Sequence, residues 1–158
     1  MNTSNDDSSS ELTLVGSFQK NQQEAVCAGV NEWHGKDYFF LRIFAPVLGS
    51  EELVPTKKGI SLEYQHIDDL LDGVKKLGEV MGGDQVVKTI PKNDNQEIRI
   101  ATSSFKGMSL LEIRTYMKFN NQPTFSPTAK GVSIQSSQYP LLLEVVSKLH
   151  KHIKSLQN

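Results

Sequence analysis

The stretch PTKKGISL at residues 55–62 decides the fold, because it recurs as PTAKGVSI at residues 127–134, an offset of 72 residues. The same offset aligns further aromatic, glycine, arginine and leucine or valine positions, namely Trp33/Phe105, Gly35/Gly107, Arg42/Arg114, Leu70/Leu142, Leu71/Leu143, Val74/Val146 and Leu77/Leu149. Glycine, proline and cationic positions coincide here in one register, with no insertion or deletion. The chain therefore contains one module twice, and duplication with fusion is the economical interpretation.

Length and composition favour two small modules that share a core. The chain has 158 residues and a single cysteine, Cys27. A module of about 60 residues removes little of its surface from water and is only marginally stable alone, so we expect the two modules to pack together as an intramolecular pseudo-dimer. The single cysteine excludes an internal disulfide, which makes a reducing, intracellular compartment the natural setting. No apolar run approaches the roughly 20 residues of a membrane-spanning helix.

Composition also suggests where the modules begin and end. Residues 1–22 are rich in Ser, Asn, Asp and Gln and are predicted to form a disordered tail. The first repeat is placed at residues 23–82, and Gly82-Gly83 marks either the end of its helix or the linker beyond it. A linker is predicted at residues 83–96, followed by the second repeat at residues 97–158.

Each module is predicted to contain four strands followed by one helix. In the second repeat, Ile98 and Ile100 alternate with polar neighbours, which is the period of a strand with one buried face. Further strands are predicted at residues 108–119, 124–128 and 132–135, with turns at 105–107, 120–123 and Lys130-Gly131. Apolar residues then recur at helical spacing from Leu142 to Ile153.

The first repeat follows the same course. Its strands are predicted around residues 26–30, 38–44, 50–56 and 58–62, and its helix carries an apolar stripe from Ile67 to Leu77. Gly73 is expected to weaken that helix by about 1 kcal/mol relative to alanine. The predicted fold class is α+β, with two four-stranded sheets, each followed by a helix.

Charge is unevenly divided between the repeats. Residues 24–82 contain six Lys and Arg against ten Asp and Glu, a net charge of −4. Residues 83–158 contain ten against five, a net charge of +5, although the whole chain has a net charge of only −1. We therefore expect the second repeat to carry the positive field.

Three segments in order, Phe105-Lys106-Gly107, Ile113-Arg114-x-Tyr116 and Lys130-Gly131-Val132-Ser133, resemble the positive cofactor four family of single-stranded-DNA-binding transcriptional coactivators. The first repeat shows Gly35, Arg42 and residues 57–62 in the same frame. The resemblance covers essentially everything beyond the tail. It implies a curved antiparallel sheet with a C-terminal helix, normally paired as a homodimer, which two copies in one chain would supply internally.

The resemblance also implies which side chains contact a nucleic acid. Trp33 and Phe105 occupy the turn aromatic that stacks on a base, and cations follow the backbone path. Several family positions are lost, including those at Ala45, Val54 and Ala129. We therefore expect modest, salt-sensitive binding dominated by the second repeat. The candidate nucleic-acid-binding residues are Trp33, Lys36, Arg42, Lys57, Lys58, Arg99, Phe105, Lys106, Arg114, Tyr116, Lys118 and Lys130.

Plainer interpretations of these residues stay open. Taken alone, Trp33 and Phe105 are more often core aromatics than stacking surfaces. Arg42 and Arg114 can cover apolar side chains or serve a structural role.

The leading hypothesis is a non-enzymatic protein that binds single-stranded or melted DNA and assists transcription, replication or repair. No cofactor or metal site is predicted, because His150 and His152 stand two apart on a helix and point to different sides. The alternatives are RNA binding and a protein-interaction or assembly module with an eroded nucleic-acid surface. The expected partners are single-stranded DNA or RNA, transcription or replication proteins and further copies of the chain, and the family implies a nuclear location.

Overall fold

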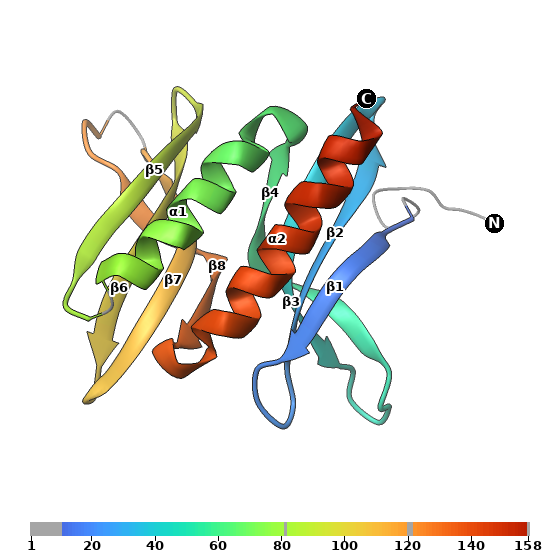
Figure 1. Ribbon diagram of the computed structural model, residues 1–158, viewed down its shortest axis with the longest axis horizontal. Helices are drawn as coiled ribbons and strands as arrows, with labels where there is room; N and C mark the ends of the chain where they lie inside the picture. The colour runs from blue at the N-terminus through green and yellow to red at the C-terminus, as the bar shows by residue number, and fades with distance from the viewer. Residues whose placement is uncertain (1–10, 81, 120–121, 158) are drawn as a thin grey trace.

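The computed structural model describes residues 11–80, 82–119 and 122–157. Two four-stranded antiparallel sheets are each followed by a helix, as predicted (Figure 1). The first unit contains β1 (Thr13–Gln19), β2 (Ala25–Trp33), β3 (Lys36–Pro46), β4 (Leu53–Glu63) and α1 (Ile67–Val80). The second contains β5 (Gln85–Asn93), β6 (Gln96–Phe105), β7 (Met108–Met117), β8 (Ser126–Gln135) and α2 (Tyr139–Leu156). Short 3-10 turns, Tyr64–His66 and Ser136–Gln138, precede the helices.

The first strand of each sheet lies where the sequence predicted none. β1 falls in the predicted tail and β5 in the predicted linker, so both predictions are wrong over these strands. Both strands are sheet edges in which a single residue, Phe18 or Ile90, is buried, which leaves little apolar alternation to detect. Residues 1–10 of the predicted tail and residues 120–121 of a predicted turn lie outside the described residues.

The repeated stretch PTKKGISL forms a bulge inside one long strand, so the predicted division into two strands is wrong. In the pairing of β3 with β4, Arg42 is opposite Gly59 and Phe44 is opposite Pro55, which leaves Ile43 facing the three residues 56–58. β7 and β8 repeat this arrangement, with Arg114 opposite Gly131 and Tyr116 opposite Pro127. A bulge of this size bends the strand and redirects its side chains.

Side chains replace the backbone hydrogen bonds that the bulge removes. The Thr56 hydroxyl donates to the Ile43 carbonyl (2.8 Å) and accepts from the Lys58 amide (3.1 Å). Arg42 Nη1 donates to the Thr56 carbonyl (3.1 Å), and Arg114 donates in the same way to the Thr128 carbonyl (2.9 Å). The two arginines therefore brace the bulges, which gives their structural interpretation a geometric basis.

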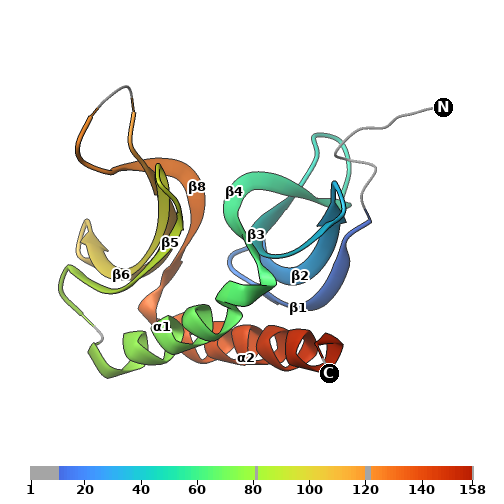
Figure 2. The same cartoon turned by 90° about the horizontal axis from the view of Figure 1, so that it is seen from above.

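The two helices are exchanged between the sheets. α1 follows the first sheet in the chain but packs on β5 and β6, whereas α2 packs on β1 and β2 (Figure 1). Viewed from above, both curved sheets lie on the same side of the helix pair (Figure 2). Apolar residues of both repeats, among them Leu41, Leu77, Ile100 and Leu149, join in one buried cluster. The predicted pseudo-dimer is confirmed, with one core shared by the two repeats.

The exchange depends on side-chain sizes that are complementary between the repeats. A Cβ atom at Gly73 of α1 would lie 2.4 Å from Ile100 Cδ1 and 3.0 Å from Lys88 Cβ. At the corresponding contact of α2 the sizes are reversed, because Gly16 of β1 lies against Val145. Gly73 is thus required by close packing, and its expected cost to helix propensity is offset by the approach that it permits.

Opposite charges complete the contact between the repeats. Asp68 of α1 contacts His150 Nε2 (2.8 Å) and Lys154 Nζ (3.0 Å) of α2. Lys88 of β5 contacts Asp69 (3.5 Å) and Asp72 (3.0 Å) of α1. The acidic first repeat and the basic second repeat therefore attract each other along the helices.

Replacing Asp68 with asparagine should lower the melting temperature slightly at pH 7, since surface ion pairs contribute little. Hydrogen bonds from Lys154 and then His150 lower the pKa of Asp68 from its usual value of 3.8. A lowered pKa means that the stabilisation is present above pH 3.8 and is lost as the pH falls through the pKa of the folded state. Thermal unfolding at decreasing pH should show the melting temperatures of the wild type and of Asp68→Asn converging in acid. A difference in melting temperature that does not depend on pH would contradict this assignment.

Candidate nucleic-acid interface

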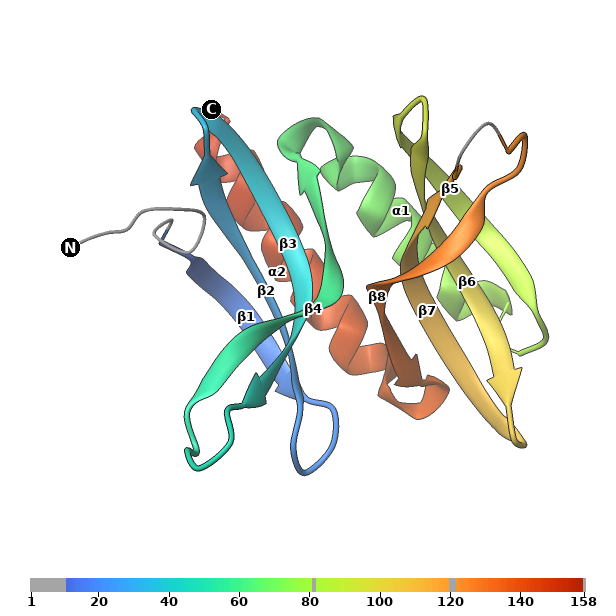
Figure 3. The same ribbon diagram turned by 180° about the vertical axis from the view of Figure 1, so that it is seen from behind.

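β4 and β8 face each other where the two sheets meet (Figure 3). Two clefts lie at this junction, and each is lined by residues of both repeats. The first cleft is lined by Arg42, Lys57, Gly59, Ile60, Ser61, Lys92, Gln96, Thr115 and Lys130. The second cleft is lined by Lys20, Ile43, Lys58, Arg114, Ala129, Gly131 and Ser133. Their volumes are about 440 and 240 Å³.

The first cleft gathers four cationic side chains. Arg42 and Lys57 come from the bulge of the first sheet, and Lys92 and Lys130 come from the second sheet. Desolvation, and then the positive charge of Lys130, lower the pKa of Lys92, and Glu63 opposes this effect. A cation that is repelled by its neighbours is well placed to receive an anion.

An aromatic pocket adjoins the first cleft. This pocket of about 350 Å³ is lined by Asn31, Trp33, Tyr38, Ser61 and Lys92, so it shares its last two residues with the first cleft. The two-residue turn between β2 and β3, with φ of 51° at His34 and 78° at Gly35, places Trp33 beside the pocket. Trp33 is 41% exposed, and its ring meets the His34 ring edge to face, with 4.1 Å between the ring centres.

The turn of the second repeat has the same form. Lys106 and Gly107 have φ of 52° and 80°, Phe105 is 57% exposed, and Lys106 Nζ lies 5.3 Å from the centre of the Phe105 ring. Lys36 is exposed at the turn of the first repeat, where it stands opposite Trp33 in the register of β2 and β3. Both turns therefore present an aromatic ring beside a cation.

The candidates on the face of β6 and β7 that points away from the shared core are engaged in contacts within the second repeat. Arg99 forms an ion pair with Glu97 (2.7 Å) and lies 4.1 Å from the centre of the Tyr116 ring. Lys118 Nζ lies 5.0 Å from the centre of the Phe125 ring. The same face of the first sheet instead carries a buried apolar cluster of Ala25, Cys27, Phe40 and Phe44. The two sheet surfaces have therefore diverged.

The structure divides the predicted residues among several places. Arg42, Lys57 and Lys130 meet in the first cleft, and Lys58 and Arg114 lie in the second. Lys92 was missed because it lay in the predicted linker, and Tyr38 was predicted only as part of a strand. The repeat could have identified Lys92, because a second lysine, Lys20, precedes it by the same 72 residues.

A metal site, a membrane-spanning helix and a phosphate-binding cavity near β1 have less support among the described residues. These contain no group of three His, Cys, Asp or Glu side chains suited to a metal ion. No helix among them has the length and apolar character needed to cross a membrane. A cavity of about 500 Å³ near β1 is lined by the acidic residues Glu11, Glu32 and Asp37, which repel phosphates.

The comparison with protein families matches each of the two repeats. The family model described as Transcriptional Coactivator p15 (PC4) matches residues 20–73 and again residues 92–145. A solved structure of a PC4 homologue from Burkholderia pseudomallei K96243 (orthorhombic crystal form) is 20% identical, with 41% of this chain and 86% of that chain covered and a TM-score of 0.35. Its tetragonal form gives 21% identity, coverage of 39% and 90%, and a TM-score of 0.36. No curated protein matches the chain significantly.

Proposed function

Because the chain belongs to the transcriptional coactivator p15 (PC4) family, we propose that it binds single-stranded or melted DNA along the first cleft and the adjoining aromatic pocket. The observation that carries this proposal is the convergence of Arg42, Lys57, Lys92 and Lys130 from two repeats beside Trp33. In this role the protein assists transcription, replication or repair, without catalysis, in the nucleus.

Phosphates and bases would be recognised by different parts of this surface. The four cations of the first cleft attract the backbone, and four phosphate contacts correspond to a slope of about −3 in log affinity against log salt. Trp33 and Tyr38 offer ring faces to unstacked bases, which contribute about 1–3 kcal/mol each. A surface that relies on stacking favours single strands, because the bases of a duplex are already stacked.

Replacing Trp33 with alanine should weaken binding of a labelled single-stranded oligonucleotide about 5- to 150-fold, the equivalent of one lost stacking contact. Fluorescence anisotropy at low salt measures this, and adding Phe105→Ala tests the second turn. Leu156→Ala, which removes another exposed apolar side chain at the end of α2, is the matched control and should bind like the wild type. No binding at low salt, or no effect of Trp33→Ala with Phe105→Ala, would contradict the proposal.

The type of nucleic acid is tested in the same assay. Parallel titrations with single-stranded DNA, duplex DNA and RNA of the same sequence should show the tightest binding to single-stranded DNA. Tighter binding of RNA would mean that RNA, and not DNA, is the ligand of this same surface.

A second candidate function is a protein-interaction or assembly module with a reduced nucleic-acid surface. The pairing of Arg99 with Glu97 and of Arg114 with Glu112 favours it, because these cations are already partly neutralised. Co-purification of a protein partner together with salt-independent, negligible oligonucleotide binding would favour this function over the first.

A further inference from the structure

The first and second clefts are related by the internal repeat. Each lining residue of the second cleft stands 72 residues from a lining residue of the first, as in the pairs Lys20/Lys92, Lys58/Lys130 and Arg114/Arg42. An exact duplication would have given the chain two equal clefts. Differences between them therefore show how the two copies have diverged as binding surfaces.

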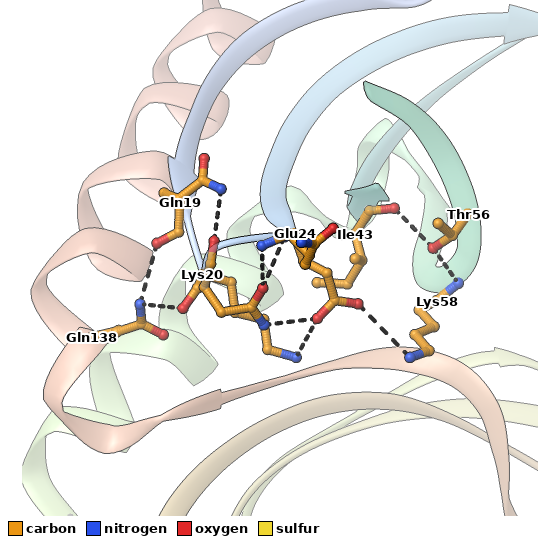
Figure 4. Close-up of polar contacts among 9 residues, drawn as sticks. Gln19, Lys20, Glu24, Ile43, Thr56, Lys58 and Gln138 are labelled. Carbon is orange, nitrogen blue, oxygen red and sulfur yellow. Dashed lines mark hydrogen bonds and ion pairs between the residues drawn. The ribbon is translucent and has the colours of Figure 1, made fainter. Parts of the chain in front are cut away.

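Glu24 makes the charge of the second cleft differ from that of the first. It forms ion pairs with both lysines of the second cleft, to Lys20 Nζ at 3.7 Å and to Lys58 Nζ at 3.8 Å (Figure 4). Asn21 donates a hydrogen bond to Glu24 Oε1 (2.9 Å) and thereby holds the carboxylate in place. That hydrogen bond is the largest cause of a lowered Glu24 pKa, followed among the lowering effects by the charges of Lys20 and Lys58, so the carboxylate is ionised at neutral pH.

The first cleft has a neutral amide at the corresponding position. Gln96 Oε1 accepts a hydrogen bond from Asn93 (3.0 Å), which reproduces the contact between Glu24 and Asn21 without the charge. Among residues 11–80, 82–119 and 122–157, no carboxylate lies within 4.0 Å of the side-chain nitrogens of Lys57, Lys92 or Lys130. Glu63 acts on Lys92 only from a greater distance.

Two further differences weaken the second cleft. Arg114 Nε is 3.1 Å from Glu112 Oε1, and the residue corresponding to Glu112 near the first cleft is Phe40. Ala129 stands where the first cleft has Lys57. The second cleft thus has three cations that contact two carboxylates, whereas the first has four cations.

We propose that the chain binds one single strand per molecule, in the first cleft, and that Glu24 with Glu112 acts as a built-in anion that keeps phosphates out of the second. This inference rests on the proposed function and adds its stoichiometry. A phosphate entering the second cleft has to compete with carboxylates attached to the same scaffold. A homodimer of single repeats would have two equal clefts, and the tandem chain has replaced that symmetry with one site.

Stoichiometry tests this proposal directly. Native mass spectrometry and calorimetry with an oligonucleotide of about eight nucleotides, a length typical of single-strand sites, should give one strand per wild-type chain. Lys57→Ala with Lys92→Ala and Lys130→Ala should abolish most binding and reduce the salt slope by about 2, for three lost phosphate contacts. The matched variant Lys20→Ala with Lys58→Ala should keep the wild-type affinity and slope.

Glu24→Gln provides the gain-of-function arm. The glutamine can keep the hydrogen bond from Asn21, because Gln96 makes the same contact in the second repeat, so the fold should be retained. Glu24→Gln with Glu112→Gln should bind a second strand per chain, and circular dichroism checks its folding. No second strand bound by the folded double variant would overturn the role of the two carboxylates.

The remaining outcomes separate this inference from the proposed function. Two strands on the wild type, or equal losses from the Lys20/Lys58 and the Lys57/Lys92/Lys130 variants, would overturn the single site and leave DNA binding intact. A wild type that binds no oligonucleotide at low salt would overturn DNA binding, and the single-site inference with it.

Discussion

Replacing Gly73 with valine should lower the free energy of unfolding by about 3 kcal/mol, at the upper end of what overpacking costs. A Cβ atom at this position lies 2.4 Å from Ile100 Cδ1, and the neighbouring Lys88 Cβ, at 3.0 Å, leaves little room for adjustment. The added side chain therefore pushes α1 away from the second sheet. Urea unfolding measures the change in stability.

Two further variants separate crowding from helix propensity. Lys75→Val places the same residue on the exposed side of α1 and should cost only the small propensity difference of a β-branched residue. Gly73→Val with Ile100→Ala copies the arrangement of Val145 and Ala28, the residues 72 positions away. This double variant should be more stable than the two single changes predict by addition. Simple additivity would show that the complementary sizes have no role in the exchange of the helices.

Replacing Gly59 with alanine should cost about 3 kcal/mol as well, and it should also weaken the proposed binding of DNA. A Cβ atom at Gly59 would lie 2.7 Å from both the Arg42 Cα atom and the Leu41 carbonyl oxygen, and backbone atoms cannot rotate away. The clash separates β3 from β4 at the bulge and displaces Arg42 and Lys57, which line the first cleft. Chemical unfolding and fluorescence anisotropy at a temperature where the variant is folded test the two effects.

Gly16→Ala is the matched control for Gly59→Ala. Gly16 is also in a strand, but its added Cβ atom would make ordinary contacts of 3.6 Å or more with Lys148 and Val145. We expect a change of about 0.5 kcal/mol or less. If both alanine variants were equally stable, the close approach at the bulge would not explain the glycine in PTKKGISL.

The parts of the fold that the sequence predicted are those whose signal recurs along the chain. The apolar stripes of the helices and the ordered block around Gly59 and Gly131 occur twice in one register. The edge strands β1 and β5 were missed because they are half exposed, so their alternation is weak. The bulge was missed because its hydrogen bonds come from Thr56 and Arg42 side chains, which no periodicity reveals.

The site was predictable in residue type but not in arrangement. Lys57 and Lys130 were candidates, yet their meeting in one cleft requires the sheets to be placed side by side. Lys92 was assigned to a linker, and the neutralising role of Glu24 depends on its position between Lys20 and Lys58. The charge imbalance between the repeats was detected, but much of it serves the contact between α1 and the second repeat.

The exchanged helices also determine the order in which the protein can fold during its synthesis. The first sheet leaves the ribosome early, but the helix that covers it, α2, follows the whole second sheet in the chain. Domains usually fold one after another as they emerge. Here the apolar face of the first sheet stays uncovered by α2, so the nascent chain exposes it to solvent and to chaperones until translation has passed both repeats.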